Sequence, residues 1–190
     1  MPELNPIFQA AVELQSFCES NGWRFCFIGG VAVQRWGEPR LTVDVDLTLL
    51  TGFGDEDRFV DRLLETFRGR RPDCREFALA TRVVLLANDH GTPLDVALGA
   101  IPFEQRTVAR TSVFDVAAGC RLLTCSAEDL VVHKCFANRD RDWADVEGIL
   151  MRQGKKLDLD LVRRELAPLA AVKNAPDILP RLEQKIARLT

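Results

Sequence analysis

The sequence predicts an α/β (α+β) fold in which a sheet-forming part precedes a helical part. Three observations support this prediction. Short apolar runs typical of strands alternate with amphipathic stretches up to residue 125. From Ser126 onward, apolar residues recur at helical spacing. The 190 residues are 47 % hydrophobic and 28 % charged, which suits a soluble globular protein with a sizeable buried core.

Local patterns predict the elements of the first part. A helix is expected between Asn5-Pro6 and Asn21-Gly22, because proline suits a first helical turn and Asn-Gly suits a helix end. Further helices are expected to start at residues 31–36 and to span residues 55–67 and 101–109. Strands are expected at residues 25–28, 43–47, 82–87, 93–98, 113–116 and 121–124, with a turn at 88–91.

The pattern from Ser126 onward predicts helices. Ser126 is a typical N-cap, because two acids follow in the first turn of the helix expected to end at Ala137. The other helices are expected at residues 140–151, 159–169 and 178–189. We therefore expect residues 1–125 to form the core and residues 126–190 to form a helical region packed on it. The net charge of +4 over residues 151–190 also allows a nucleic-acid-facing role.

Composition narrows the function classes. The six cysteines form no Cys-x-x-Cys pair and fit no zinc template, so we expect buried thiols in a reducing compartment. The N-terminus lacks the pattern of a signal peptide, and no apolar run approaches the length of a membrane span. We expect a cytoplasmic protein with no membrane partner. With only His90 and His133, and no Gly-x-Ser-x-Gly, a hydrolase triad fits poorly.

Two aspartates alternate in Val43-Asp44-Val45-Asp46-Leu47. In a strand, Asp44 and Asp46 would share one face, and the three apolar residues would share the other. Like charges side by side repel, so the pattern is costly unless a cation neutralises it. Hard divalent ions such as Mg²⁺ prefer oxygen ligands of this kind. The pair is therefore a candidate metal site.

Gly29-Gly30 stands between an expected strand and an expected helix. Glycine there permits positive φ and a close approach of the backbone to a ligand. The helix N-terminus then offers unpaired N–H groups to a phosphate. A phosphate cradle followed by Asp-x-Asp predicts chemistry on a nucleoside triphosphate.

Two further features accompany this stretch. Asp95 is the acid of an otherwise apolar strand, and a lone buried carboxylate is costly. It must either have a partner or join the metal site. Residues 68–75 form a basic loop, which is either a solvated connection or a contact to substrate phosphates.

The string Gly29-Gly30…Gly37-x-x-Arg40-x-Thr42-x-Asp44-x-Asp46 resembles the signature of DNA polymerase β-like nucleotidyltransferases. It is similar to the AbiEii-type branch, which includes nucleotidyltransferase toxins of toxin–antitoxin pairs. The resemblance covers about residues 25–150. Many relatives carry Gly-Ser at the first step, whereas Gly30 offers no hydroxyl to the triphosphate.

The resemblance implies a polymerase β-like core with a mixed sheet, followed by C-terminal helices. It also implies a third carboxylate on a strand beside Asp-x-Asp. Asp95 matches by type and by place in the order of elements, and Asp89 is the weaker substitute. Asp44, Asp46 and Asp95 would then hold two Mg²⁺ (or Mn²⁺) ions.

The resemblance also implies nucleotide-binding residues. Lys134 matches a phosphate-binding lysine on the first helix after the sheet, and Asp142 would orient it or the base. Without the resemblance, residues 134–145 would be interpreted as an exposed, charged helix face with local ion pairs. We expect Asp145 to have a structural role. Arg40 would contact the triphosphate or the acceptor, and Thr42 would order the loop.

The implied reaction is transfer of an NMP from an NTP to an acceptor hydroxyl. We expect a toxin-like enzyme that acts on RNA (tRNA) or protein and has a cognate antitoxin as partner. One alternative is a non-catalytic NTP-sensing module. The other is a transferase that modifies a small molecule such as an antibiotic.

Overall fold

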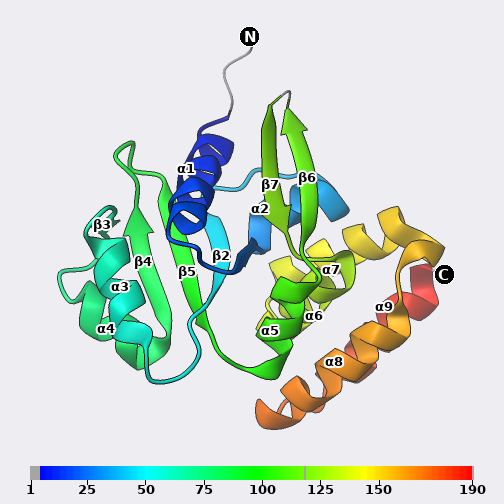
Figure 1. Ribbon diagram of the computed structural model, residues 1–190. Helices are drawn as coiled ribbons and strands as arrows, with labels where there is room; N and C mark the ends of the chain where they lie inside the picture. Colours follow the sequence, from blue (N-terminus) through cyan, green and yellow to red (C-terminus); the bar gives the residue numbers. More distant parts are fainter. Residues whose placement is uncertain (1–4, 118, 190) are drawn as a thin grey trace. The chain divides into compact units, whose positions relative to one another are not determined.

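The computed structural model describes residues 5–117 and 119–189 (Figure 1). The chain divides into two compact units. The first, here called the sheet unit, comprises the described residues within Met1–Val31 and Leu41–Cys125. The second, here called the helical unit, comprises those within Ala32–Arg40 and Ser126–Thr190. Helix α2 (Gly29–Trp36) begins in the sheet unit and ends in the helical unit.

The sheet unit is built on a mixed sheet, as the sequence predicts. Its strand order in the described residues is β3-β4-β5-β2-β1-β7-β6. Strand β2 pairs in parallel with β5, and β1 with β7, whereas the remaining neighbours are antiparallel. The strands are β1 (Phe25–Phe27), β2 (Val45–Leu50), β3 (Arg68–Gly69), β4 (Val83–Ala87), β5 (Pro93–Gly99), β6 (Ser112–Ala117) and β7 (Cys120–Thr124).

Four helices complete the sheet unit: α1 (Pro6–Ser20), α3 (Glu56–Leu64), α4 (Cys74–Thr81) and α5 (Pro102–Ala109). The predicted bounds of α1 are confirmed. The Asn5 side chain accepts a hydrogen bond from the N–H of Ile7 at 2.9 Å, and Gly22 takes a φ of +67° just after the helix. Because this φ suits glycine, Asn21-Gly22 ends the helix where the sequence indicates.

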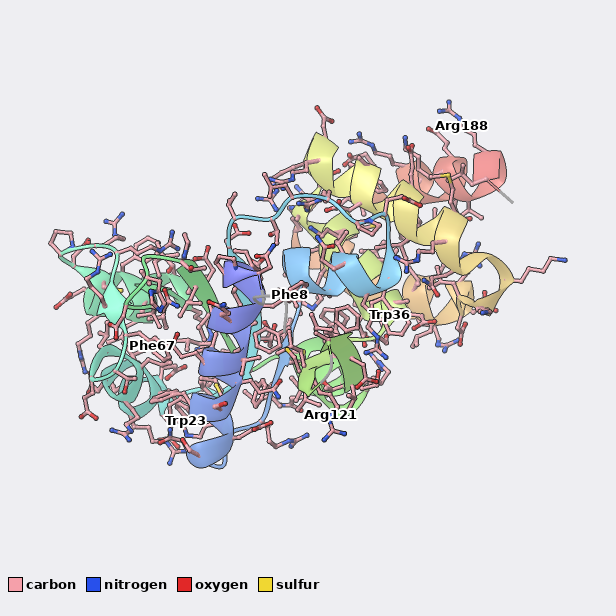
Figure 2. The ribbon with its side chains drawn as sticks, turned by 90° about the horizontal axis from the view of Figure 1, so that it is seen from above. Phe8, Trp23, Trp36, Phe67, Arg121 and Arg188 are labelled. Atoms are coloured by element: carbon pink, nitrogen blue, oxygen red, sulfur yellow. The ribbon has the colours of Figure 1, made fainter. Side chains whose placement is uncertain are left out.

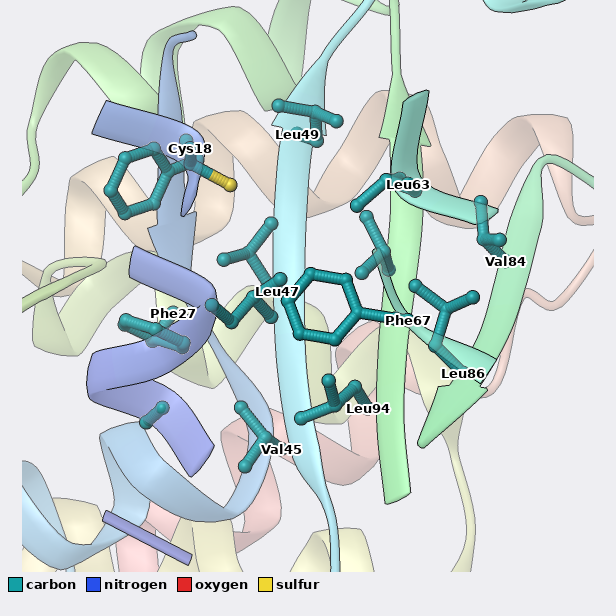
Figure 3. Close-up of a cluster of buried hydrophobic side chains, with 14 of the residues drawn as sticks. Cys18, Phe27, Val45, Leu47, Leu49, Leu63, Phe67, Val84, Leu86 and Leu94 are labelled. Carbon is teal, nitrogen blue, oxygen red and sulfur yellow. The ribbon is translucent and has the colours of Figure 1, made fainter. Parts of the chain in front are cut away.

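The core of the sheet unit lies on one face of the sheet. Alternate residues of β2 and β5 point into it (Figure 3). Buried residues of α1, α3 and α4 belong to the same core. Leu47, Leu94 and Phe27 are among the fully buried side chains. Trp23 and Phe67, both labelled in Figure 2, come from different segments of the sheet unit. Both pack edge-on against Phe17 of α1, with ring centroids 5.5 and 5.3 Å away. The alternation of buried and half-buried residues shows the face on which the side chains around Asp46 and Asp95 lie.

Two sequence predictions for this unit are wrong in detail. Val43 is 61 % exposed and precedes β2, because pairing with β5 begins only at Val45. The loop expected at residues 68–75 is shorter in the structure and covers only residues 70–73. Residues 68–69 form β3 and pair with β4, and residues 74–75 form the start of α4. The sequence does not predict α4, because only two of its residues, Cys74 and Ala78, are buried. Two buried positions are too few to show a helical period.

The helical unit contains α6 (Ala127–Ala137), α7 (Asp140–Gln153), α8 (Leu159–Val172) and α9 (Ile178–Leu189). The predicted N-cap is confirmed, because the Ser126 hydroxyl accepts from the N–H of Asp129 at 3.1 Å. Gly154 ends α7 with a φ of +51°. The buried apolar side chains of these helices include Leu130, Val146, Ile149, Leu166 and Leu182. Among the described residues, no helix has both the length and the apolar character that a membrane span requires.

Candidate active site

Asp46 and Asp95 lie directly opposite each other on the parallel strands β2 and β5. The residues on either side of each aspartate are fully buried in the core, whereas both aspartates are half-buried. Because side chains alternate along a strand, the two carboxylates share the face that points away from the core. The structure therefore brings together two acids that are 49 positions apart in the sequence.

Asp44 lies in a bend immediately before β2. The hydroxyl of Thr42 donates to Asp44 Oδ1 at 3.1 Å, and its oxygen is 3.3 Å from the main-chain oxygen of Asp44. Burial raises the pKa of Asp95 above its usual value, the Arg70 guanidinium opposes this, and the negative charge of Asp44 raises it further. Because Asp44 directly precedes β2 and Asp46 is the second residue of that strand, the three predicted acids lie at the same end of β2.

The two glycines pack tightly against this acid group. Gly29 has a φ of +55°, and a Cβ atom added there would lie 1.8 Å from Asp46 Oδ2. The N–H of Gly30 donates to the same oxygen at 3.4 Å. A Cβ atom added at Gly30 would lie 2.1 Å from the hydroxyl oxygen of Thr42. Glycine is therefore required at both positions, because Asp46 and Thr42 occupy the space of a side chain.

We predict that Gly29→Ala reduces the rate of the expected nucleotide transfer in addition to reducing stability. Gly91 is the matched control, because its φ is +81° and nothing lies within 4 Å of an added Cβ atom. Both alanine variants should lose about 1 kcal/mol of folding free energy to the positive φ. Only Gly29→Ala displaces Asp46, so only it should reduce the transfer rate. Chemical denaturation and initial rates measure the two effects, and equal activity of the two variants would contradict this reading.

Arg70 is the residue of this site that the sequence did not single out. Its N–H donates to the carbonyl of Leu85 at 2.9 Å, and Leu85 is the register partner of Asp95. Leu85, Asp95 and Asp46 thus lie in a row across β4, β5 and β2, and Arg70, directly after β3, continues this row. The Arg70 guanidinium forms an ion pair with Asp95 Oδ1. The basic composition of residues 68–75 indicates a charged contact. That the partner of Arg70 is Asp95 follows only from the order of the strands.

The three carboxylates suit divalent cations in their chemistry, because Mg²⁺ and Mn²⁺ prefer oxygen donors. In this structure each acid has its own protein partner: Asp44 has Thr42, Asp46 has the Gly30 amide, and Asp95 has Arg70. No group of three or more His, Cys, Asp or Glu side chains within residues 5–117 and 119–189 is arranged to hold a metal ion. The three acids therefore suit such ions by the chemistry of their donors, although these side chains are not arranged around a metal position in this structure.

A second cluster of charges lies within the helical unit. The Lys134 ammonium is 2.8 Å from Asp145 and 3.3 Å from Asp142, and all three side chains are at least nine-tenths buried. Arg40 binds Asp145 with two hydrogen bonds of 2.6 and 2.7 Å. Arg139 donates to Asp142 at 2.6 Å. Asp145, expected to be structural, is the residue that joins Arg40 to Lys134.

The cluster keeps both acids ionised. Burial alone would raise the pKa of Asp145, but hydrogen bonds from Arg40 and Lys134 outweigh it and lower that pKa below its usual value. The pKa of Asp142 is lowered in the same way, against burial, by Arg139 and Lys134. The five side chains are thus three cations and two carboxylates, and the cations hold both carboxylates in the charged form.

Solved structures share this fold. One is an antigenic nucleotidyltransferase-like protein from Paracoccidioides brasiliensis, with 17 % identity, a TM-score of 0.56, and coverage of 93 % of this chain and 92 % of that one. Another is the antibiotic-resistance factor ANT(2'')-Ia in solution, with 15 % identity, a TM-score of 0.57, and coverage of 90 % and 94 %. At these identities the likeness shows the fold alone. No curated protein sequence matches the chain at a significant level.

A protein-family model gives the decisive comparison. The family described as "Nucleotidyl transferase AbiEii toxin, Type IV TA system" matches residues 18–189. The match spans both units and includes every acid, glycine and basic residue of the two clusters described above. The chain belongs to the AbiEii family of nucleotidyltransferases.

Proposed function

We propose that this nucleotidyltransferase is a toxin-like enzyme that depends on divalent metal and transfers an NMP from an NTP to a hydroxyl of RNA or protein. The observation that carries the proposal is the register of Asp46 opposite Asp95, with Asp44 directly before the strand of Asp46 and Gly29 packed against Asp46. Three carboxylates near the start of β2 repel one another, and divalent cations would relieve this repulsion. Family membership supports catalysis over the alternative of a non-catalytic nucleotide sensor.

The reaction is an in-line displacement at the α-phosphorus. The acceptor oxygen forms a bond to that phosphorus, the bond to the β-phosphate bridging oxygen breaks, pyrophosphate leaves, and the hydroxyl proton is released. Asp44, Asp46 and Asp95 would hold the divalent ions, which when bound stabilise negative charge on the attacking and leaving oxygens. The N–H groups at Gly29-Gly30 would face the phosphates, and Thr42 positions Asp44 through its hydrogen bond.

In the helical unit we propose that Lys134 is a phosphate-binding cation. Asp142 orients it through the 3.3 Å contact between its carboxylate and the ammonium. Arg40, whose side chain is 26 % exposed, would contact the triphosphate or the acceptor, while its Asp145 contacts hold its position.

RNA is our first candidate for the acceptor, and protein is the second. The surplus of basic residues over residues 151–190 supports a nucleic-acid acceptor, because Lys and Arg neutralise phosphates. The family description as a toxin of a toxin–antitoxin system supports a cognate antitoxin as partner. The likeness to ANT(2'')-Ia leaves an antibiotic as the alternative acceptor.

We predict label transfer that depends on metal and on Asp46. The protein is incubated with each α-labelled NTP and Mg²⁺ or Mn²⁺, in the presence of cellular RNA, a protein extract or an aminoglycoside. Label should enter RNA or protein, and both EDTA and Asp46→Ala should abolish it. Labelling that persists in Asp46→Ala would refute the site. Label found on the aminoglycoside alone would support the small-molecule alternative, and nucleotide binding without transfer would support the sensor.

A further inference from the structure

We propose that Arg70 is an exchangeable counter-ion of Asp95. In the metal-free protein it neutralises this carboxylate, and in the complex with metal and nucleotide its guanidinium binds phosphate oxygens instead. The inference rests on the proposed function, because it assumes that Asp95 takes part in holding the divalent cations. It adds a nucleotide-binding residue from a segment that lies outside the Gly-Gly and Asp-x-Asp stretch.

The position of Arg70 supports the first half of this exchange. Its main chain is fixed beside β4 by the hydrogen bond to Leu85, while its guanidinium reaches past that strand to Asp95. The side chains of Arg70 and Asp95 are each 31 % exposed. A partly exposed pair of this kind contributes little net free energy, so another cation can replace the arginine. A guanidinium and a divalent cation compete for the same carboxylate oxygen.

The neighbouring arginines do not share this property. Arg71 forms two hydrogen bonds of 2.9 Å with Asp73, its neighbour in the turn. Arg75 contacts Asp57 at 2.9 Å and Asp61 at 2.7 Å, both on or beside α3. Of these three arginines, only Arg70 contacts a candidate metal ligand.

The second half of the exchange follows from charge and reach. When a cation takes over Asp95, the Arg70 guanidinium loses its anion while it remains next to the site. A triphosphate that binds the same cations brings several negative charges to this place. The planar guanidinium donates two parallel hydrogen bonds to a phosphate, which a lysine cannot do. The released guanidinium therefore gains a new partner without a movement of the backbone.

The test compares two affinities that should change in opposite directions. Mn²⁺ binding without nucleotide is measured by electron paramagnetic resonance, and binding of a non-hydrolysable ATP analogue is measured at saturating Mn²⁺ by calorimetry. Arg70→Ala should bind Mn²⁺ about fivefold more tightly, because a competing ion pair is removed. It should bind the analogue about tenfold more weakly, because a charged hydrogen-bond donor is lost. Arg71→Ala is the matched control and should change neither affinity.

Arg70→Lys keeps the positive charge but not the bidentate geometry. It should bind Mn²⁺ as the wild type does and bind the analogue several-fold more weakly. If Arg70→Ala bound both Mn²⁺ and the analogue more weakly, Arg70 would only hold Asp95 in position, and the proposal would be overturned. Unchanged affinity for the analogue would also overturn it. The metal site itself is tested with Asp44→Asn. If this variant bound Mn²⁺ as tightly as the wild type does, the metal site would be refuted. The failure of the exchange is thus distinguishable from the failure of the proposed function.

Discussion

Asp95→Asn is expected to lower the rate of nucleotide transfer by a factor of about 10²–10³, the size typical for loss of one group that stabilises transition-state charge. Asparagine keeps the shape of the side chain but removes the charge opposite Asp46. With two carboxylates left instead of three, divalent cations bind more weakly and stabilise the leaving pyrophosphate less well. The measurement is the initial rate of label transfer at saturating NTP and over a range of Mg²⁺ concentrations.

Asp89→Asn is the matched control for this substitution. Asp89 is an exposed carboxylate in the turn between β4 and β5, six positions before Asp95 in the sequence. It was the weaker candidate for the third acid, so its replacement should leave the rate within about twofold of the wild type, as expected for a surface substitution. A rate that falls in Asp89→Asn and stays normal in Asp95→Asn would assign the third carboxylate to the turn.

The sequence predicts those parts of the site that depend on local pattern. Gly29-Gly30 and Asp44-x-Asp46 lie within 18 residues, and their spacing already indicates a strand–helix junction followed by an acidic strand. Asp95 stands out because a lone carboxylate in an apolar strand is costly. The local pattern also overextends the strand at Val43, since alternation alone does not show where pairing with β5 begins.

The contacts that complete the site are non-local, and no pattern in one sequence reveals them. Arg70 reaches Asp95 only because β4 lies between β3 and β5. Thr42 fills the space beside Gly30 only because the chain folds back before β2. Arg40 and Asp145 are 105 positions apart, and nothing in either local stretch indicates that they pair. Such pairs follow from tertiary packing, which overrides what a charged helix face suggests on its own.

The Arg40–Asp145 pair leads to the prediction with the largest effect on stability. Asp145→Ala is expected to lower the free energy of unfolding by about 3 kcal/mol, because removal of one member of a buried ion pair leaves its partner uncompensated. The Asp145 side chain is 4 % exposed and that of Lys134 is 8 % exposed. Arg40 is 26 % exposed and recovers some hydration, which places the cost at the lower end of the usual range. Urea unfolding measures the loss, and the melting temperature should fall by about 10 °C.

Asp140→Ala on the same helix separates burial from simple loss of charge. The Asp140 carboxylate is fully exposed and lies 3.4 Å from Arg181, so its removal should cost only the small contribution of an acid in the first turn of α7, far less than the removal of Asp145. Asp145→Asn should recover part of the loss, because the amide oxygen still accepts a hydrogen bond from Arg40 or Lys134. Equal stabilities of Asp145→Ala and Asp140→Ala would mean that water solvates the Lys134 cluster in solution. Water could then take the place of the carboxylates that contact the Lys134 ammonium. The proposal that Asp142 orients Lys134 would lose its physical basis.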